Sequence, residues 1–191
     1  MIVSNFAALF DANVLYSAPL SDFVMQLVQT GLFRAKWTEQ IHQEWINSLL
    51  ENRSDLTRSK LERRRDLMNK HAEGCLVTNY EDLIPSLQLP DANDRHVLAA
   101  AIRGRADVIV TNNLKHFPRN TLVKFGIEAQ HPDQFFTHLL DLAPTAVCTA
   151  AKRQRESLQN PPKTVAEFLE TLEATGLAQT VARLREFAEL I

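Results

Sequence analysis

The sequence lacks several features that are typical of secreted proteins, of membrane proteins and of proteins that bind nucleic acid through a broadly basic surface. It has two cysteines, Cys75 and Cys148, each alone in its surroundings, which excludes a disulfide framework and a CxxC metal site and favours the reducing cytoplasm. The longest apolar runs, residues 6–10 and 97–102, fall far short of the roughly 20 residues that cross a bilayer, so we expect no membrane span.

An excess of positive charge is also missing, because the formal net charge is -2. A broadly basic surface is therefore excluded, and any contact with nucleic acid must be local. Residues 53–70 hold seven Lys or Arg against three Asp or Glu, a local charge of +4. Phosphate contacts supply most non-specific affinity for nucleic acids, so this segment is the candidate for binding a nucleic-acid backbone. An ordinary solvated helix with ion pairs four residues apart explains the same pattern. The candidate contacts are Arg58, Arg63, Arg64 and Arg65.

The chain of 191 residues is long enough for one α/β domain with an appendage. Apolar runs at residues 6–10 and 107–110 each end in polar residues and are followed by amphipathic stretches. This alternation predicts parallel βαβ units. Glycine is scarce, and Gly31, Gly104 and Gly126 each follow a predicted helix, where glycine adopts left-handed torsions without strain.

The pattern changes to helices alone after about residue 130. Prolines at positions 161 and 162 interrupt this region. Thr164 and Glu167 then have the spacing of a capping box, which predicts a helix that starts there. We expect a helical hairpin at the C-terminus, and we divide the chain into residues 1–130 and 131–191.

Three acidic residues stand where chemistry is expected. Asp11 ends the first predicted strand, Glu44 lies at the margin of the apolar stripe of a helix over residues 38–52, and Asp94 precedes an apolar helix with Asp91 in the same turn. Simpler roles exist for each acid. Asp11 and Asp94 are at positions where an aspartate often caps a helix. The Glu44 side chain either faces water or forms a hydrogen bond with a polar residue one turn away.

Carboxylates that gather in one place repel one another, so a fold brings them together mainly to hold hard cations such as Mg²⁺ or Mn²⁺. Such an ion lowers the pKa of a bound water and clamps phosphate oxygens, which suits hydrolysis of phosphodiesters. Thr111 and Asn113 follow the second predicted strand, and their hydroxyl and amide groups are candidates to orient water or ligands. The simpler role for this segment is an ordinary turn, which asparagine favours. The histidines show no zinc-binding spacing, and no nucleophile elbow or P-loop is present. A phosphatase of the haloacid dehalogenase type is disfavoured because it needs an acid where Asn13 stands.

Four segments in this order resemble the PIN domain, the ribonuclease fold of VapC-type toxins. They are FDANVLYS (10–17), WTEQIHQEW (37–45), LPDANDRHVLAAA (89–101) and VIVTNNLKHFP (108–118). The resemblance implies a three-layer α/β/α domain with a central parallel sheet, followed here by a small all-helical C-terminal extension. It also implies an endoribonuclease that uses Mg²⁺ or Mn²⁺, with Asp11, Glu44 and Asp94 as its first three acids. An RNA substrate, an antitoxin protein and often a homodimer are the implied partners.

The sequence departs from the family where a fourth acid usually follows the threonine by two residues, because Asn113 stands there. Three outcomes are open: Asp91 takes over as a metal ligand, the Asn113 amide positions a metal-bound water, or the enzyme uses one metal or is poorly active. The competing hypothesis is a catalytically lapsed PIN-like module that binds RNA or a partner.

Overall fold

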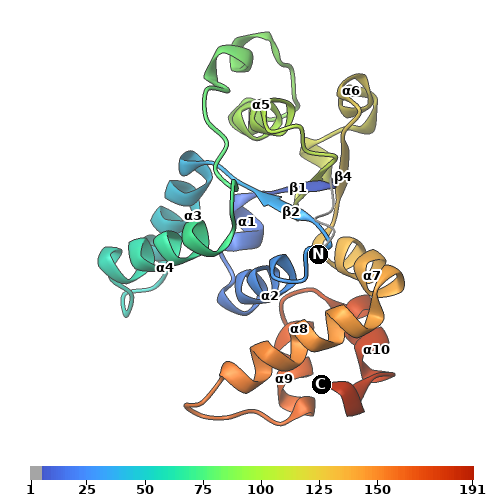
Figure 1. Cartoon of the computed structure of the whole chain (residues 1–191). Helices are drawn as coiled ribbons and strands as arrows, with labels where there is room; N and C mark the ends of the chain where they lie inside the picture. The colour runs from blue at the N-terminus through green and yellow to red at the C-terminus, as the bar shows by residue number, and fades with distance from the viewer. Residues whose placement is uncertain (1–5) are drawn as a thin grey trace.

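A parallel β-sheet lies at the centre of the fold (Figure 1). The computed structural model describes residues 6–191. The strands are β1 (Ala7–Phe10), β2 (Arg34–Lys36), β3 (Val108–Val110) and β4 (Glu128–Gln130), in the spatial order β2-β1-β3-β4. The two central strands are fully buried, as their unbroken apolar runs predict. Since all three strand pairs are parallel, the carboxyl ends of the strands share one edge.

Helices cover both faces of the sheet, which confirms the predicted three-layer arrangement. In Figure 1, α5 and α6 lie above the sheet, and α1, α2 and α7 lie below it. No helix in the described part of the chain combines the length and apolarity of a membrane span. The first six helices are α1 (Ala12–Leu15), α2 (Ala18–Val28), α3 (Glu39–Asn52), α4 (Arg58–His71), α5 (Arg95–Arg103) and α6 (Arg119–Leu122).

The predicted all-helical region follows β4 and consists of α7 (Pro132–Leu142), α8 (Pro144–Ser157), α9 (Val165–Glu173) and α10 (Ala178–Arg185). The capping box is confirmed, because Thr164 and Glu167 each bond to the other's backbone at the start of α9. Phe135 and Phe136 of α7 pack edge-on against Phe10 and Phe23. The C-terminal helices therefore share the hydrophobic core that supports the sheet.

Two of the three glycine predictions are confirmed. Gly31 and Gly126 have φ of 74° and 69°, in the left-handed region. The prediction for Gly104 is wrong, since its φ is -76°. Instead, a Cβ at Gly104 would lie 2.8 Å from Cγ2 of Val77. Gly104 is required by a close approach between the end of α5 and the segment that carries Val77, and not by its backbone torsions.

Candidate metal centre

Asp11 lies at the carboxyl end of β1 and is buried. Its Oδ1 accepts a hydrogen bond of 2.7 Å from the backbone N–H of Ala12, so it caps α1. Its Oδ2 accepts a 2.7 Å bond from the Thr111 hydroxyl and a further bond from Nδ2 of Asn13. The predicted capping role of Asp11 is therefore confirmed. The second carboxylate oxygen, Oδ2, is held at the edge of the sheet by Thr111 and Asn13.

The loop after β3 holds Asp11 in place. The Thr111 hydroxyl, which is buried, also accepts a 3.0 Å bond from the backbone N–H of Asn113. Asn13 contacts this loop as well, because its Oδ1 accepts a 3.0 Å bond from the backbone N–H of Asn112. In the sequence, Asn13 served only as evidence against a phosphatase, which needs an acid at that position. Its role in orienting Asp11 was not predicted. Asn113 is exposed, and its function in orienting water stays a prediction.

Asp91 and Asp94 lie just before α5: Asp91 is the N-cap of the short 3-10 helix Ala92–Asp94, and Asp94 is the last residue of that helix. Asp91 caps that turn through its Oδ1, which accepts from the backbone N–H of Asn93 at 2.9 Å. Asp94 occupies the N-cap position of α5, but within residues 6–191 its side chain makes no capping hydrogen bond. Asp94 therefore has the predicted N-cap position, but its side chain does not make a capping bond. Its Oδ2 lies 2.7 Å from Nδ1 of His116 instead.

His116 belongs to the 3-10 helix Leu114–His116, which follows β3. Its Nδ1 is 4.0 Å from Oδ2 of Asp91 as well. Asp91, Asp94 and His116 each offer one metal-binding atom, and these atoms lie within 4.8 Å of one another. Sequence reasoning missed His116 because it sought histidines paired at short spacing along one helix. Here the ligand-type side chains come from two segments that only the fold brings together.

Glu44 faces the same region from α3. Its Oε1 lies 2.9 Å from Nε2 of His96, on α5. The same oxygen accepts a 3.2 Å bond from Nε2 of Gln40, one turn earlier, as the simpler interpretation allowed. His96 is buried, and its Nδ1 has no hydrogen-bond partner among the described residues. The contact with Glu44 was not predicted.

Burial and neighbouring charges both act on the carboxyl group of Asp11. Burial raises the pKa of Asp11, and the charges on Asp94 and Glu44 raise it further, against hydrogen bonds from Thr111 and Ala12 that lower it. Burial also raises the pKa of Asp94, and His116 opposes this. The ligand-type atoms that lie within 4.8 Å of one another, however, are those of Asp91, Asp94 and His116. That Asp11 and Glu44 share an ion with Asp94 stays a prediction.

These oxygen atoms suit a hard divalent cation. Ligand atoms on one six-coordinate Mg²⁺ or Mn²⁺ ion are about 3 Å apart when adjacent and about 4 Å apart when opposite, from bond lengths near 2.1 Å. The separations of 2.7 Å and 4.0 Å around His116 are close to these values. The 2.7 Å separation is also that of the hydrogen bond between His116 and Asp94, which a bound ion would replace.

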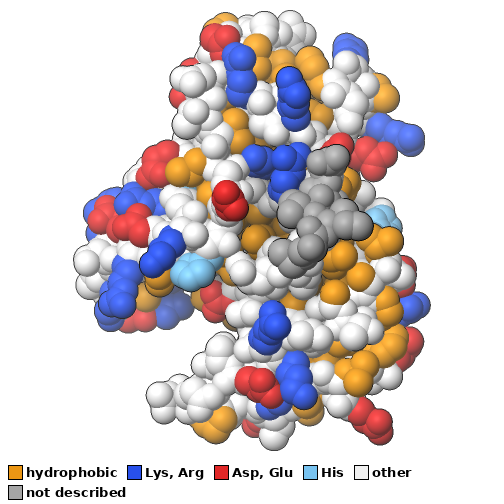
Figure 2. Space-filling model, viewed as in Figure 1, with side chains coloured by type: hydrophobic (Ala, Val, Ile, Leu, Met, Phe, Trp, Pro, Cys, Tyr) orange, Lys and Arg blue, Asp and Glu red, His pale blue; other side chains and the backbone are white. Residues whose placement is uncertain are grey.

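The basic segment differs in part from the expectation. Arg64 does not face solvent as a nucleic-acid contact should, because its Nη2 donates a 2.8 Å bond to the carbonyl of Leu15 and its guanidinium lies 4.8 Å from the ring centre of Trp45. Arg65 pairs with Glu39 at 3.0 Å and Arg58 lies 4.0 Å from Glu62, whereas Arg63 is exposed. Figure 2 shows basic and acidic side chains mixed over this part of the surface.

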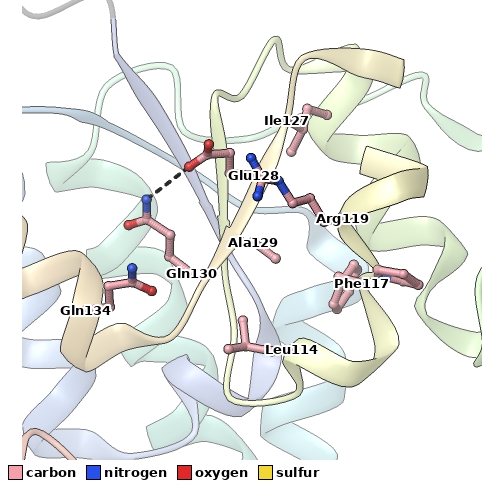
Figure 3. A pocket seen from close by; sticks show the side chains of 9 residues that line it. Leu114, Phe117, Arg119, Ile127, Glu128, Ala129, Gln130 and Gln134 are labelled. Carbon is pink, nitrogen blue, oxygen red and sulfur yellow. Dashed lines mark hydrogen bonds between the residues drawn. The ribbon is translucent and has the colours of Figure 1, made fainter. Parts of the chain in front are cut away.

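A separate hollow of about 420 Å³ lies beside the free edge of β4 (Figure 3). Apolar side chains, including Leu114 and Phe117, line one part of it, and Arg119 and Glu128 lie at another part. Leu114 and Phe117 flank the turn that carries His116. The hollow is therefore close to His116 in the chain, but its lining contains none of Asp11, Glu44, Asp91 and Asp94.

Known families match both parts of the chain. A family model described as the PIN domain matches residues 7–115, more than half of the sequence. The chain belongs to the PIN-domain family. The model for the VapC50 C-terminal domain matches residues 132–186, so this PIN protein has the C-terminal extension of VapC-type proteins.

A curated PIN relative from Mycobacterium tuberculosis, named "Putative ribonuclease VapC50", is 44% identical over 93 residues. The match covers 49% of this chain and 54% of the relative, so the chain spans about half the length of that protein. No solved structure matches this sequence.

Proposed function

We propose that this PIN protein is a metal-dependent endoribonuclease that hydrolyses RNA phosphodiester bonds as the toxin of a type II toxin-antitoxin system. One observation carries the proposal. The buried carboxylate of Asp11 lies within electrostatic range of Glu44 and Asp94, at the carboxyl end of the parallel sheet. Burying the Asp11 carboxylate near other negative charges costs folding free energy, which a bound cation offsets.

In this proposal, Asp11, Glu44 and Asp94 hold Mg²⁺ or Mn²⁺, and Asp91 is a further ligand. When bound, such an ion lowers the pKa of a coordinated water and polarises the phosphate. Thr111 keeps Asp11 oriented through its hydroxyl, and Asn113, next to it, orients water or substrate. No side-chain nucleophile is required, because the fixed charges supply the electrostatic stabilisation.

The toxin assignment is supported by the name of the mycobacterial relative and by the C-terminal family match. It implies an RNA substrate, a cognate antitoxin, a homodimer and action in the cytoplasm. We also propose that residues 1–130 form the nuclease unit and residues 131–191 form its extension. On the basic segment, Arg58, Arg63 and Arg65 are the proposed contacts for the RNA backbone, and Arg64 is withdrawn from that set because it is hydrogen-bonded to Leu15.

The test compares RNA cleavage with and without Mn²⁺ in the wild type, Asp11→Asn and Asp94→Asn. Asp141→Asn is the matched control, because Asp141 lies in α7 and pairs with Arg183 on the surface. We expect cleavage that requires the ion, is lost in the two site variants and is kept in the control. Cleavage that is unchanged in Asp11→Asn would mean that the activity comes from another source.

The alternative is a PIN-like module whose chemistry has lapsed. It is favoured by one observation, the asparagine at position 113 where the family has an acid. This alternative predicts RNA binding without cleavage at any concentration of Mn²⁺ or Mg²⁺, which the same assay measures alongside a filter-binding titration.

A further inference from the structure

β4 is an edge strand, and within residues 6–191 no strand pairs with it on the side away from β3. The backbone N–H of Glu128 donates a 3.0 Å bond to the carbonyl of Asp107. The carbonyl of Gln130 accepts a bond of 3.0 Å from the N–H of Thr111. Because the backbone groups of successive residues in a strand point to opposite sides, the N–H and carbonyl of Ala129 point away from β3. This edge therefore presents a donor and an acceptor to a further strand.

At the opposite edge, the chain itself continues the sheet. Trp37 follows β2 and forms a parallel bridge with Leu76. Its N–H donates a 3.0 Å bond to the carbonyl of Cys75, and its carbonyl accepts a 2.9 Å bond from the N–H of Val77. An edge that the protein leaves uncovered is a template on which another chain adds a strand. In the described part of the chain, β4 is such an edge.

The hollow of about 420 Å³ lies along this edge and has an apolar part (Figure 3). Leu114, Phe117 and Ala129 line it, and Leu114 is 40% exposed. Val123 and Phe125, in the segment that leads into β4, are 64% and 42% exposed. Three of the eight exposed large apolar side chains in residues 6–191 thus lie between β3 and β4. Apolar surface that gathers in this way marks a site of interaction.

The charge around the hollow is positive. Lys115, Arg119 and Lys124 are exposed, and none of them makes an ion pair within the described residues. With histidine counted as neutral, residues 114–130 hold these three cations against one acid, Glu128, a local charge of +2 in a chain of net charge -2. Charges across an interface are usually complementary. An occupant with Asp or Glu side chains therefore matches this surface.

Two other occupants match fewer of these features. A second copy of the chain, paired through β4, would bring the same basic segment to both sides of the contact, where like charges repel. RNA matches the charge, but it has no peptide backbone that continues a β-sheet. An acidic peptide matches the edge, the hollow and the charge together.

We propose that β4 and the hollow beside it bind an extended acidic peptide of another protein, which adds a strand to the sheet and places an apolar side chain against Leu114 and Phe117. The peptide backbone pairs with the N–H and carbonyl of Ala129, and Arg119 binds an acidic side chain of the peptide. The inference goes beyond the proposed function and does not depend on it, because the hollow is lined by none of the acids that would hold the metal.

The experiment selects phage-displayed random peptides on the full-length protein, and calorimetry measures the affinity of the enriched peptides after synthesis. Ala129→Pro removes the N–H at the free edge and spares the bonds from Glu128 and Gln130 to the β3 side, and proline is tolerated at such edge positions. Arg119→Glu reverses the charge at the hollow. Arg153→Glu is the matched control, because Arg153 is exposed on α8 and does not line the hollow. Circular dichroism and the melting temperature check that each variant is folded.

We expect acidic peptides with a large apolar residue to be enriched and to bind the wild type and Arg153→Glu equally well. Ala129→Pro and Arg119→Glu should each bind them roughly fivefold to tenfold more weakly, the usual effect of losing one hydrogen bond or charge contact. In the wild type, hydrogen exchange at the amide of Ala129 should slow when the peptide is added. This last measurement needs no variant, so it tests the edge even if Ala129→Pro does not fold.

The inference is overturned if no enriched peptide is sensitive to both substitutions, or if exchange at Ala129 is the same with and without peptide. It is also overturned if analytical ultracentrifugation shows a wild-type dimer that Ala129→Pro dissociates, because a second copy then occupies the edge. Displacement of the peptide by a single-stranded RNA whose binding depends on Arg119 and not on Ala129 would assign the surface to RNA instead. None of these measurements uses RNA cleavage, so the nuclease proposal and this inference fail separately.

Discussion

Nε2 of His96, on α5, lies 2.9 Å from Oε1 of Glu44, on α3. The two helices belong to segments that are distant in the chain, and this contact joins them close to Asp94. His96 is buried, whereas the Glu44 side chain is 38% exposed, so the fixed partner is the histidine. As the second residue of α5, two positions after Asp94, His96 is a positioning residue for Glu44.

The first prediction concerns this contact. His96→Gln should lower RNA cleavage by roughly 10- to 100-fold, as the loss of a partner behind a metal ligand usually does. The main effect should be a higher Mn²⁺ concentration at half-maximal rate, because Glu44 loses its orientation. Cleavage as a function of Mn²⁺ measures both parameters. His138→Gln, on the exposed face of α7, is the control. An unchanged metal dependence with a lower melting temperature would make His96 a purely structural residue.

The second prediction concerns pH. The pKa of Asp11 is raised, chiefly by burial, so the folded protein holds this proton to a higher pH than the unfolded chain does. Between the unfolded value, about 3.9, and the raised folded value, the folded state binds more protons, and the free energy of unfolding falls as pH rises. We therefore expect the free energy of unfolding of the metal-free wild type to fall with pH relative to that of Asp11→Asn, which does not titrate.

Urea unfolding of both proteins in chelator, from pH 4 to pH 7, measures that difference. The constant cost of the altered hydrogen bonds in Asp11→Asn does not affect the slope. A difference that grows with pH would show that the carboxylate is stabilised in its charged form, against the burial that the structure shows.

The third prediction separates two neighbouring arginines. Arg64→Leu removes the bond to the carbonyl of Leu15, and should lower the free energy of unfolding by about 2 kcal/mol, as is typical for a hydrogen bond from a charged group. Arg63 is exposed, so Arg63→Glu should leave stability within error. It should weaken RNA binding and reduce the slope of log affinity against log salt by about one. Thermal melts and salt-dependent binding titrations give the two readouts. RNA affinity that Arg63→Glu does not change would remove this segment from the binding surface.

The fourth prediction concerns the close approach at Gly104. Gly104→Ala places a methyl group against Val77 and should destabilise the protein by about 1 to 3 kcal/mol, the usual range for overpacking. Val77→Ala in the same chain should recover part of that loss, because it removes the atom at 2.8 Å. Gly126→Ala is the comparison, since its cost comes from the left-handed torsion, and Val77→Ala should not recover it. Equal effects of Val77→Ala on both variants would argue against the contact.

The sequence predicts the features that local patterns determine. The buried run before Asp11 shows a central strand, and the polar residues that end two such runs place Asp11 and Thr111 at the same edge of a parallel sheet. The capping box at Thr164 is equally local, and it is confirmed.

The contacts that the sequence did not predict depend on segments distant in the chain. His116 meets Asp94, and His96 meets Glu44, only after helices and turns pack on the sheet. Arg64 looks like its basic neighbours in sequence, but it lies on the inner side of α4, where it contacts Leu15 and Trp45. Whether an arginine faces solvent depends on which side of its helix packs against the rest of the protein. The number of charges in a segment does not indicate that side.

The packing of α8 along α2 has a consequence for recognition by other proteins. Nε2 of Gln154, in α8, donates a 2.8 Å bond to the carbonyl of Pro19, in the first turn of α2. The C-terminal extension thus covers this flank of the PIN domain. A protein that binds this PIN domain meets α8 on that flank, and removal of the C-terminal helices would expose the apolar side chains of α2 and favour self-association.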